Sequence, residues 1–254
     1  MANTIITGRK PVIEALRAGT QIEKILILTG IQGRVIEEIR TLAGQRGVQL
    51  AEVNKQRFRE VATDSTTQGV VAVIPERTFI DLDTLLAAAA AQPRKGFLLI
   101  LDEIEDPHNL GALVRTAECA GAHGVIVPRH HSAPVTGTVI KASAGATEYV
   151  PMAEVTNIVS TIKTLKDTGY WIVGLDGTAD KHYAAVDYTS PVALVVGNEG
   201  KGIRRLVREN CDHLVKIPLL GRIASLNASV AGAVVMFEVV RQREENPGVN
   251  AGDV

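Results

Sequence analysis

The chain has 254 residues, 46% of them hydrophobic and 22% charged, which is typical of a soluble globular protein with one large or two modest domains. Its 27 Lys and Arg nearly cancel its 28 Asp and Glu, so net charge alone indicates no partner. Cys119 and Cys211 are too few and too far apart for a disulfide framework or a zinc site, and we expect no metal.

The start of the chain lacks the apolar core of a signal peptide. The longest apolar run, 228–237, is far shorter than the ~20 residues of a membrane helix. We therefore expect a cytoplasmic protein without a membrane segment.

The charges are unevenly distributed along the chain. Residues 1–59 contain ten Lys or Arg and five Glu, whereas residues 60–254 contain 17 Lys or Arg and 23 Asp or Glu. A basic N-terminal module suggests a polyanion bound at that end. A solvated charged face is the alternative, and charge taken alone favours it.

The N-terminal part predicts a small α/β domain over residues 1–77. Pro11 is typical of a helix start, and strands are expected over 24–29, 48–53 and 70–74. A helix is expected over 33–46, and Asn54 is expected to cap a short helix that carries Lys55, Arg57 and Arg59. Residues 78–95, which contain an alanine-rich helix over 82–91, are expected to link this domain to the next.

From residue 96 to 254, strands and helices alternate. Continuous apolar runs predict buried strands at 97–101, 124–128, 170–175 and 192–196, and another apolar run covers 214–220. Helices are expected over 109–120, 136–142 and 154–167, and a long one ends near Val240. This alternation predicts an α/β domain whose sheet is mostly parallel and covered by helices on both faces.

Two common phosphate-binding motifs are excluded. No G-x-G-x-x-G follows a strand, which argues against a dinucleotide fingerprint. The glycine loop at 197–202, GNEGKG, lacks the spacer and the Ser or Thr of an ATP loop. It also places Glu199 where it would repel a triphosphate.

Three loops follow apolar strands and should meet at the carboxyl edge of the sheet, where ligands bind in such folds. They are DPHNLGALVR at 106–115, GNEGKG at 197–202 and IPLLGRIASLNAS at 217–229. Taken alone, Asn109 could be only a helix cap and Arg115 only a surface residue. The three loops together, in this order, resemble those of the SpoU family of RNA ribose 2′-O-methyltransferases, within the SPOUT class.

Two further stretches narrow the resemblance. GRKPVIEAL at 8–16 is similar to the start of that family's RNA substrate-binding domain. KASAGATE at 141–148 is similar to the branch that methylates a guanosine in 23S ribosomal RNA. The resemblance therefore implies 2′-O-methylation of a ribose in 23S ribosomal RNA. The same chemistry on transfer RNA or another ribosomal site, or an RNA-binding protein without turnover, remain alternatives.

The resemblance also implies a C-terminal trefoil knot, a homodimer and S-adenosylmethionine as the methyl donor. Carried over to this sequence, the cofactor-binding residues are Gly197, Ile217, Leu226, Leu175, Gly177, Gly200, Pro218, Leu219 and Ser229. The polar residues expected in catalysis are Arg115, Asn109, Glu199, Ser225 and Asn227, and Arg115 and Asn109 can come from the opposite subunit. Arg9, Lys10 and Lys141 are expected to contact RNA.

Overall fold

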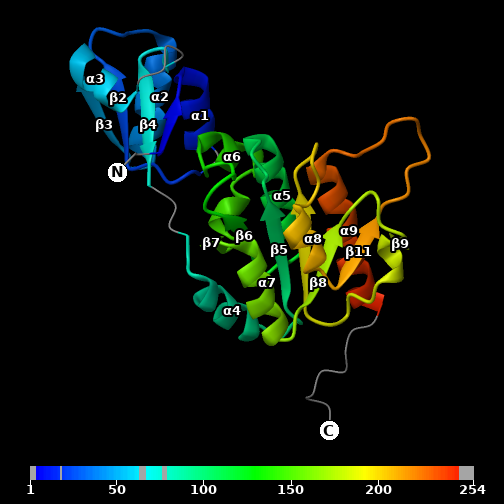
Figure 1. The fold of residues 1–254 in the computed structure, drawn as a ribbon. Helices are drawn as coiled ribbons and strands as arrows, with labels where there is room; N and C mark the ends of the chain where they lie inside the picture. The colour runs from blue at the N-terminus through cyan, green and yellow to red at the C-terminus, as the bar shows by residue number, and fades with distance from the viewer. Residues whose placement is uncertain (1–3, 18, 63–66, 76–78, 246–254) are drawn as a thin grey trace. The chain divides into compact units, whose positions relative to one another are not determined.

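The computed structural model describes residues 4–17, 19–62, 67–75 and 79–245, which form two compact units. The first unit contains the described residues up to 75 together with 134–145. The second contains 79–133 and 146–245. Figure 1 shows each unit as a sheet flanked by helices.

The N-terminal unit is built on a four-stranded mixed sheet. Its order is β1-β4-β2-β3, with β2 and β3 parallel and β4 antiparallel to β1 and β2. Its elements are β1 (Thr4–Thr7), α1 (Arg9–Arg17), β2 (Lys24–Leu28), α2 (Arg34–Gln45), β3 (Gln49–Val53), α3 (Lys55–Val61) and β4 (Val70–Ile74). All the strands and helices expected between residues 11 and 74 are present. The four-residue β1, too short to stand out as a pattern, was not predicted.

Helices cover both faces of this sheet. One apolar cluster joins α1 and α2 to the sheet, and Ile25 and Ile36 are fully buried in it. A second cluster, on the other face, holds Phe58 of α3. Asn54 caps α3 as predicted, because its side-chain oxygen accepts a hydrogen bond from the Arg57 N–H at 2.9 Å. The short helix α3 is therefore fixed at both its cap and its buried side.

Residues 134–145 group with the N-terminal unit, although the sequence placed them in the 96–254 domain. They contain α6 (Gly137–Ala142), whose Ile140 packs against the α1–α2 core cluster. Lys141, which we predicted to contact RNA, forms an ion pair with Glu14 of α1. The sequence gives no sign of this grouping, because α6 lies between elements of the other unit in the chain.

The second unit is built on a seven-stranded sheet of order β7-β6-β5-β10-β8-β11-β9, and each pairing between its described strands is parallel. Its strands are β5 (Phe97–Asp102), β6 (Gly124–Pro128), β7 (Met152–Val155), β8 (Trp171–Leu175), β9 (Lys181–His182), β10 (Val192–Gly197) and β11 (His213–Lys216). Its helices are α4 (Leu82–Ala90), α5 (Pro107–Cys119), η2 (Ala146–Glu148), α7 (Ile158–Asp167), η3 (Tyr183–Ala185), α8 (Arg205–Glu209) and α9 (Ala228–Glu245). Every residue of β5, β6 and β10 is buried, as expected for strands covered on both faces. The mostly parallel α/β architecture is confirmed.

The predicted linker 78–95 is partly a structural element of the second unit. Leu85 of α4 is fully buried in the core cluster of the second unit. A Cβ at residue 124 would lie 2.3 Å from Leu85 Cδ1, so glycine at the start of β6 makes room for this side chain. The second unit therefore begins at residue 79 rather than at 96, because α4 packs against it.

Three other predictions need correction. The helix expected from residue 154 begins only at Ile158, because 152–155 forms strand β7 beside β6 and Asn157 caps the helix. The apolar run 214–220 leaves the sheet after Lys216, and Leu220 is fully exposed. The long last helix continues to Glu245, five residues beyond Val240. Among the described helices, none is both long and apolar enough to cross a membrane.

Candidate active site

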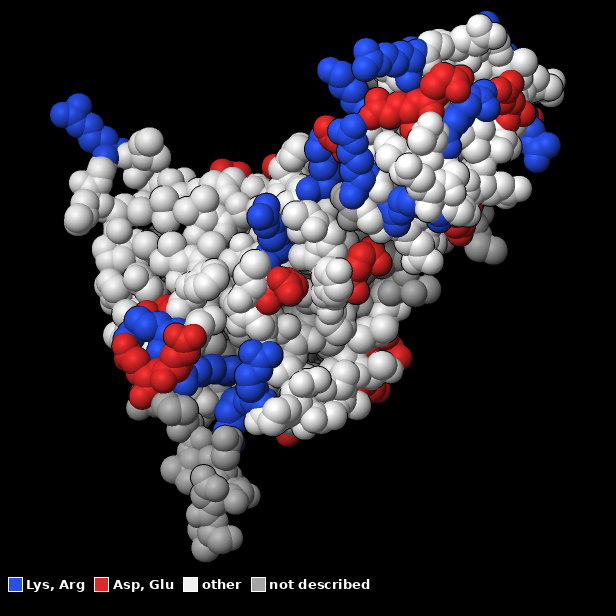
Figure 2. Space-filling view, turned by 180° about the vertical axis from the view of Figure 1, so that it is seen from behind, with Lys and Arg blue, Asp and Glu red and all other residues white. Residues whose placement is uncertain are grey.

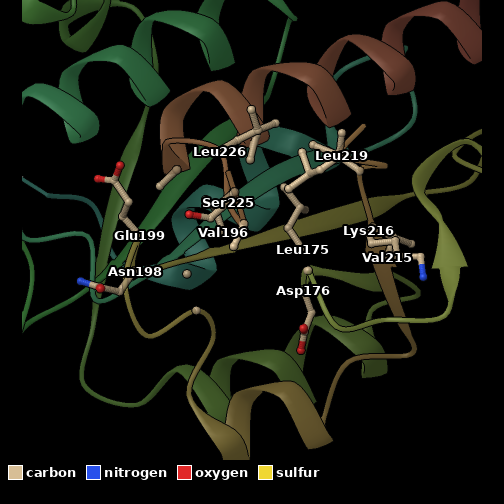
Figure 3. Close-up of a pocket in the computed structure, with 17 residues that line it drawn as sticks. Leu175, Asp176, Val196, Asn198, Glu199, Val215, Lys216, Leu219, Ser225 and Leu226 are labelled. Atoms are coloured by element: carbon tan, nitrogen blue, oxygen red, sulfur yellow. The ribbon is translucent and has the colours of Figure 1, made fainter. Parts of the chain in front are cut away.

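A pocket lies at the carboxyl ends of β8, β10 and β11. Figure 3 shows Glu199 and Asn198 on one side of it and Lys216 and Val215 on the other, with Leu175, Val196 and Ser225 between them. Its lining includes six predicted cofactor-binding residues and two predicted catalytic residues: Leu175, Gly177, Gly197, Ile217, Leu219, Leu226, Glu199 and Ser225. The sheet therefore brings the second and third of the predicted loops to one edge, together with the end of β8.

Gly197 is required by the backbone of the loop that follows it. A Cβ at this position would lie 2.3 Å from the carbonyl carbon of Gly202 and 2.4 Å from the Ile203 nitrogen. The chain comes back this close because Asn198 and Gly202 exchange backbone hydrogen bonds of 3.1 and 2.8 Å, and Gly202 has a φ of +71°. Any side chain at 197 must therefore displace the turn that lines the pocket.

Asn198 ties this turn to the neighbouring strand. Its side-chain oxygen accepts hydrogen bonds from the N–H groups of Gly200 and Lys201, at 2.9 and 3.2 Å. Its side-chain nitrogen donates to the carbonyl oxygen of Glu103 at 3.0 Å. Gly200, predicted to bind cofactor, thus contributes to the turn without lining the pocket.

An ion pair between a buried carboxylate and an exposed arginine fixes the far end of the same loop. Asp102, the last residue of β5, is fully buried. Its carboxylate accepts hydrogen bonds from the Arg204 Nε–H at 2.7 Å and from the Arg204 backbone N–H at 2.8 Å. The Arg204 guanidinium also approaches Glu103, at 3.7 Å. Sequence reasoning missed this pair, since 102 positions separate its members and neither belongs to the three motifs.

Three predicted catalytic side chains form a hydrogen-bonded cluster beside the pocket. The Asn109 amide donates to Glu199 at 3.3 Å, and the Asn227 amide donates to Asn109 at 2.8 Å and to Glu199 at 3.3 Å. Asn109 is only 8% exposed. It is not the cap of α5, because Asp106 accepts the capping hydrogen bond from the His108 N–H. The reading of Asn109 as a mere helix cap is therefore wrong.

Asn227 also starts the last helix. Its side-chain oxygen accepts hydrogen bonds from the Ser229 N–H at 2.9 Å and the Ser229 hydroxyl at 2.6 Å. Ser229, predicted to bind cofactor, instead orients the Asn227 amide toward Asn109 and Glu199, and it does not line the pocket. Pro218 is likewise outside the lining.

Asp176 lines the pocket and is held as a carboxylate. Burial raises its pKa, but hydrogen bonds from Thr178 and the charge of Arg208 lower it by more, so its pKa lies below the ordinary value of 3.8. The carboxylate forms an ion pair with Arg208 at 2.5 Å. At the pocket edge this carboxylate is balanced by Arg208, and Lys216 also lines the pocket.

Arg115 is not part of the cluster. It lies exposed on α5, and no described residue forms an ion pair or hydrogen bond with its guanidinium. The unused donors of Arg115 leave it available to a group from outside this chain.

The chain matches two family models. Residues 96–237 match the SpoU rRNA methylase family, and residues 5–79 match the domain described as RNA 2′-O ribose methyltransferase substrate binding. A Staphylococcus saprophyticus protein assigned to the TrmH family of tRNA/rRNA methyltransferases is 44% identical over 243 residues, which cover 96% of this chain and 97% of that protein.

Solved structures agree with these matches. The SpoU methyltransferase AviRb from Streptomyces viridochromogenes, in complex with AdoMet, is 26% identical with a TM-score of 0.69, covering 96% of this chain and 91% of that chain. An AdoMet-bound rRNA methyltransferase from Sinorhizobium meliloti is 27% identical with a TM-score of 0.66, covering 94% of this chain and 87% of that chain. From these matches, together with the second and third motifs that line one pocket and Asn109 of the first that donates to Glu199, we conclude that this chain belongs to the SpoU family of RNA methyltransferases.

Proposed function

We propose that this protein transfers a methyl group from S-adenosylmethionine to the 2′-hydroxyl of a guanosine ribose in 23S ribosomal RNA. One observation carries the proposal: the glycine turn at 197–202 and the Asn109–Glu199–Asn227 cluster adjoin a single pocket. The family membership supports the reaction. The choice of 23S guanosine rests on the KASAGATE stretch at 141–148.

The pocket suits the methyl donor in shape and charge. Leu175, Ile217 and Leu226 offer apolar surface for an adenine ring, and the turn after Gly197 brings backbone groups close to it. Asp176 and Glu199 lie on the lining, which favours a ligand that carries a sulfonium and an ammonium group. S-adenosylmethionine supplies an already activated methyl group when it is bound.

The residues of the chain then have to orient the hydroxyl and stabilise its developing negative charge. We assign this task to Arg115, whose guanidinium offers a fixed fork of donors. The oxygen–methyl bond would form as the sulfur–methyl bond of the donor breaks, leaving S-adenosylhomocysteine, and the proton of the hydroxyl would pass to a phosphate or to water. Asn227 and Asn109 hold the Glu199 carboxylate in place at the mouth of the pocket, and Ser225 adds a hydroxyl to its lining.

We also propose that two copies of the chain pair and that the C-terminal part is knotted. Val230 and Phe237 of α9 are 48% and 49% exposed, and Ile223 before them is 79% exposed, so this segment offers apolar surface to a second copy. The unpartnered Arg115 is consistent with a site that spans two subunits. From β8 the chain goes to the edge strand β9, comes back across the sheet to β10 and returns to β11, and we propose that these crossings form the knot.

The direct test is a methylation assay with labelled S-adenosylmethionine. Unmodified 23S ribosomal RNA and unmodified transfer RNA are incubated separately with the protein, and the 2′-O-methyl position is mapped in each. We expect methylation of one guanosine in the 23S RNA. Methylation of transfer RNA alone would contradict the proposed substrate. Donor binding without methylation of either RNA would contradict the proposed activity.

A further inference from the structure

A second cavity opens at the amino edge of the larger sheet, away from the glycine turn at 197–202. Its volume is about 1520 Å³, and it is lined by residues before and at the start of β5, by the turn after α5, by the segment 184–190 and by the end of α9. β5 and β10 each run six residues from this edge to the other, which is about 20 Å at the usual rise per residue. The cavity is therefore separate from the donor pocket.

Arg243 of α9 places a positive charge at the wall of this cavity. Its guanidinium donates hydrogen bonds of 2.8 to 3.0 Å to four backbone carbonyl oxygens, those of Lys95, Gly96, Tyr188 and Ser190. These bonds fix the side chain, but a carbonyl group carries no net charge and so does not neutralise the guanidinium. No carboxylate of the described residues pairs with Arg243. The structure thus holds a partly buried cation here without an anionic partner among those residues.

His123 supplies a hydrogen-bond donor beside this cation. Its Nδ1 accepts a hydrogen bond from the Phe97 N–H at 3.0 Å, so a neutral ring carries its proton on Nε2. Nε2 is buried, and it has no hydrogen-bond partner among the described residues. Burial lowers the pKa of His123, and the positive charges of Arg94 and Arg243 lower it further, which favours the neutral ring. A buried donor of this kind calls for an acceptor.

Two exposed cations, Arg94 and Lys95, complete the group. Neither pairs with a carboxylate of the described part of the chain. The Arg94 guanidinium rests against Gly121, because a Cβ at 121 would lie 2.5 Å from Arg94 Nη1. Figure 2 shows, on the larger unit, a group of Lys and Arg side chains beside a second group that mixes both charges.

Acidic side chains also line the cavity, but two of them have partners of their own. Asp187 accepts hydrogen bonds from the N–H and the hydroxyl of Thr189, at 2.8 and 2.7 Å. Glu245 pairs with Arg241 at 2.6 Å, and Glu244 is exposed on the last turn of α9. The carboxylates therefore lie along the end of α9 and the segment 184–190, whereas the two exposed cations stand in the loop before β5.

We propose that Arg94, Lys95, Arg243 and His123 form a binding site for a phosphate group. Three cations and a neutral N–H donor suit a ligand with two negative charges and several acceptor oxygens better than a carboxylate with one charge. The phosphate would accept hydrogen bonds from the Arg94 fork and, once this exposed side chain moves, from His123 Nε2. The cavity is larger than a phosphate ion, so it also has room for a small molecule that carries the phosphate. None of the residues assigned to methyl transfer takes part.

The test is a calorimetric titration of the full-length protein with inorganic phosphate at constant pH and ionic strength. The cavity variant is Arg94→Gln/Lys95→Gln. The matched control, Lys163→Gln/Arg205→Gln, removes two exposed cations of the same unit outside the cavity lining. Loss of charge-assisted hydrogen bonds should weaken phosphate binding by the cavity variant about tenfold or more. The control should bind phosphate within about twofold of the wild type, because exposed distant charges are screened.

The histidine rings give a second readout by proton–nitrogen NMR. Phosphate should shift the signal of His123 Nε2 but not that of His130, which is exposed beyond the end of β6 at the opposite edge. The affinity for S-adenosylmethionine should stay unchanged in both variants, because the donor pocket lies at the other edge. Unchanged donor affinity also verifies that each variant is folded.

The source of the phosphate is distinguished by repeating the titration with a nucleoside 5′-monophosphate. An affinity at least about tenfold above that of inorganic phosphate would assign the site to the phosphate of a nucleotide, and a smaller difference or weaker binding would assign it to the free ion. The proposal is overturned if the wild type does not bind inorganic phosphate or if the cavity variant binds it as tightly as the wild type. A control variant that loses as much affinity as the cavity variant would overturn it as well.

Discussion

The two units both present binding groups at the carboxyl edge of a sheet, yet the two edges have opposite character. The edge of the larger sheet holds a turn of close backbone contacts and the carboxylate of Glu199, whereas Asp102 and Asp176 are each paired with an arginine. The edge of the smaller sheet carries Lys10, Lys55 and Arg57, which have no carboxylate partner among the described residues. Topology thus determines where a ligand meets the chain, and side-chain chemistry determines which ligand. A compact, positively charged donor suits the first edge, and a polyanion suits the second.

Disrupting the glycine turn at 197–202 should have the largest effect, which is the loss of donor binding at the edge of the larger sheet. Gly197→Val should abolish binding of S-adenosylmethionine, because even the first carbon of the side chain meets the backbone of Gly202 and Ile203. Gly200→Ala is the matched control, since a Cβ there finds its nearest neighbour at 3.6 Å, an ordinary contact. Calorimetry measures both affinities. A folded Gly197→Val protein with wild-type donor affinity would show that the turn does not shape the site.

Substitutions of Arg115 test whether methyl transfer needs the shape of the guanidinium as well as its positive charge. Arg115→Lys keeps the charge but loses the fork of donors, so turnover should fall nearly as far as in Arg115→Ala, by about 10²–10³. Donor affinity and thermal stability should remain unchanged, because the exposed Arg115 has no partner within the described chain. Arg205→Lys, in an exposed pair with Glu209, is the control. Near-normal turnover in Arg115→Lys would mean that charge alone suffices.

Breaking the Asp102–Arg204 pair should reduce donor affinity less than disrupting the turn at 197–202. Asp102→Asn removes the charge that Arg204 faces, so the loop from 197 to 204 should loosen. We expect the free energy of unfolding to fall by about 2 kcal/mol, because charge-assisted hydrogen bonds are lost but Arg204 is exposed, and we expect donor affinity to fall about tenfold. Urea unfolding and calorimetry measure the two effects.

Glu154→Gln provides the contrast for that experiment. It breaks the partly exposed pair with Arg129, at 2.9 Å and outside the pocket lining. It should cost at most about 1 kcal/mol and leave donor affinity unchanged. Equal donor affinities in Asp102→Asn and the wild type would remove Asp102 from the support of the pocket.

Sequence patterns predicted the motif residues that meet at the pocket, but not the contacts that hold them. Asn109, Glu199 and Asn227 stand in three motifs, each after a strand, and parallel strands deliver their loops to one edge. Asp102 and Arg204 carry no such signal, because an ion pair between distant residues has no local periodicity. The sequence likewise did not show that the Ser229 hydroxyl donates to Asn227 and helps to orient its amide.

The assignment of α4 and α6 to compact units could not be predicted for a related reason. The alanine-rich helix α4 reads as part of a connection, since its composition does not show that Leu85 fits into the space left by Gly124. The grouping of α6 with the N-terminal unit depends on Ile140 reaching a core formed more than 60 residues earlier in the chain. Local patterns identify elements well, whereas the partner of each element depends on contacts between distant residues.

The smallest expected effect concerns the contribution of the Asp176 carboxylate to the free energy of unfolding. The pKa of Asp176 in the folded protein lies below 3.8, so its ion pair stabilises the fold above that pH and is lost as the pH falls through the folded pKa. Asp176→Asn should therefore lower the free energy of unfolding at pH 7 by about 1 kcal/mol, and the difference from the wild type should shrink below about pH 4. Urea unfolding at pH 7, 5 and 3 measures this. Asp187→Asn is the comparison, because Thr189 also lowers the pKa of Asp187 but no cation pairs with it among the described residues, so its effect should be smaller. A difference for Asp176→Asn that stays the same at all three pH values would show that its carboxylate acts through packing rather than charge.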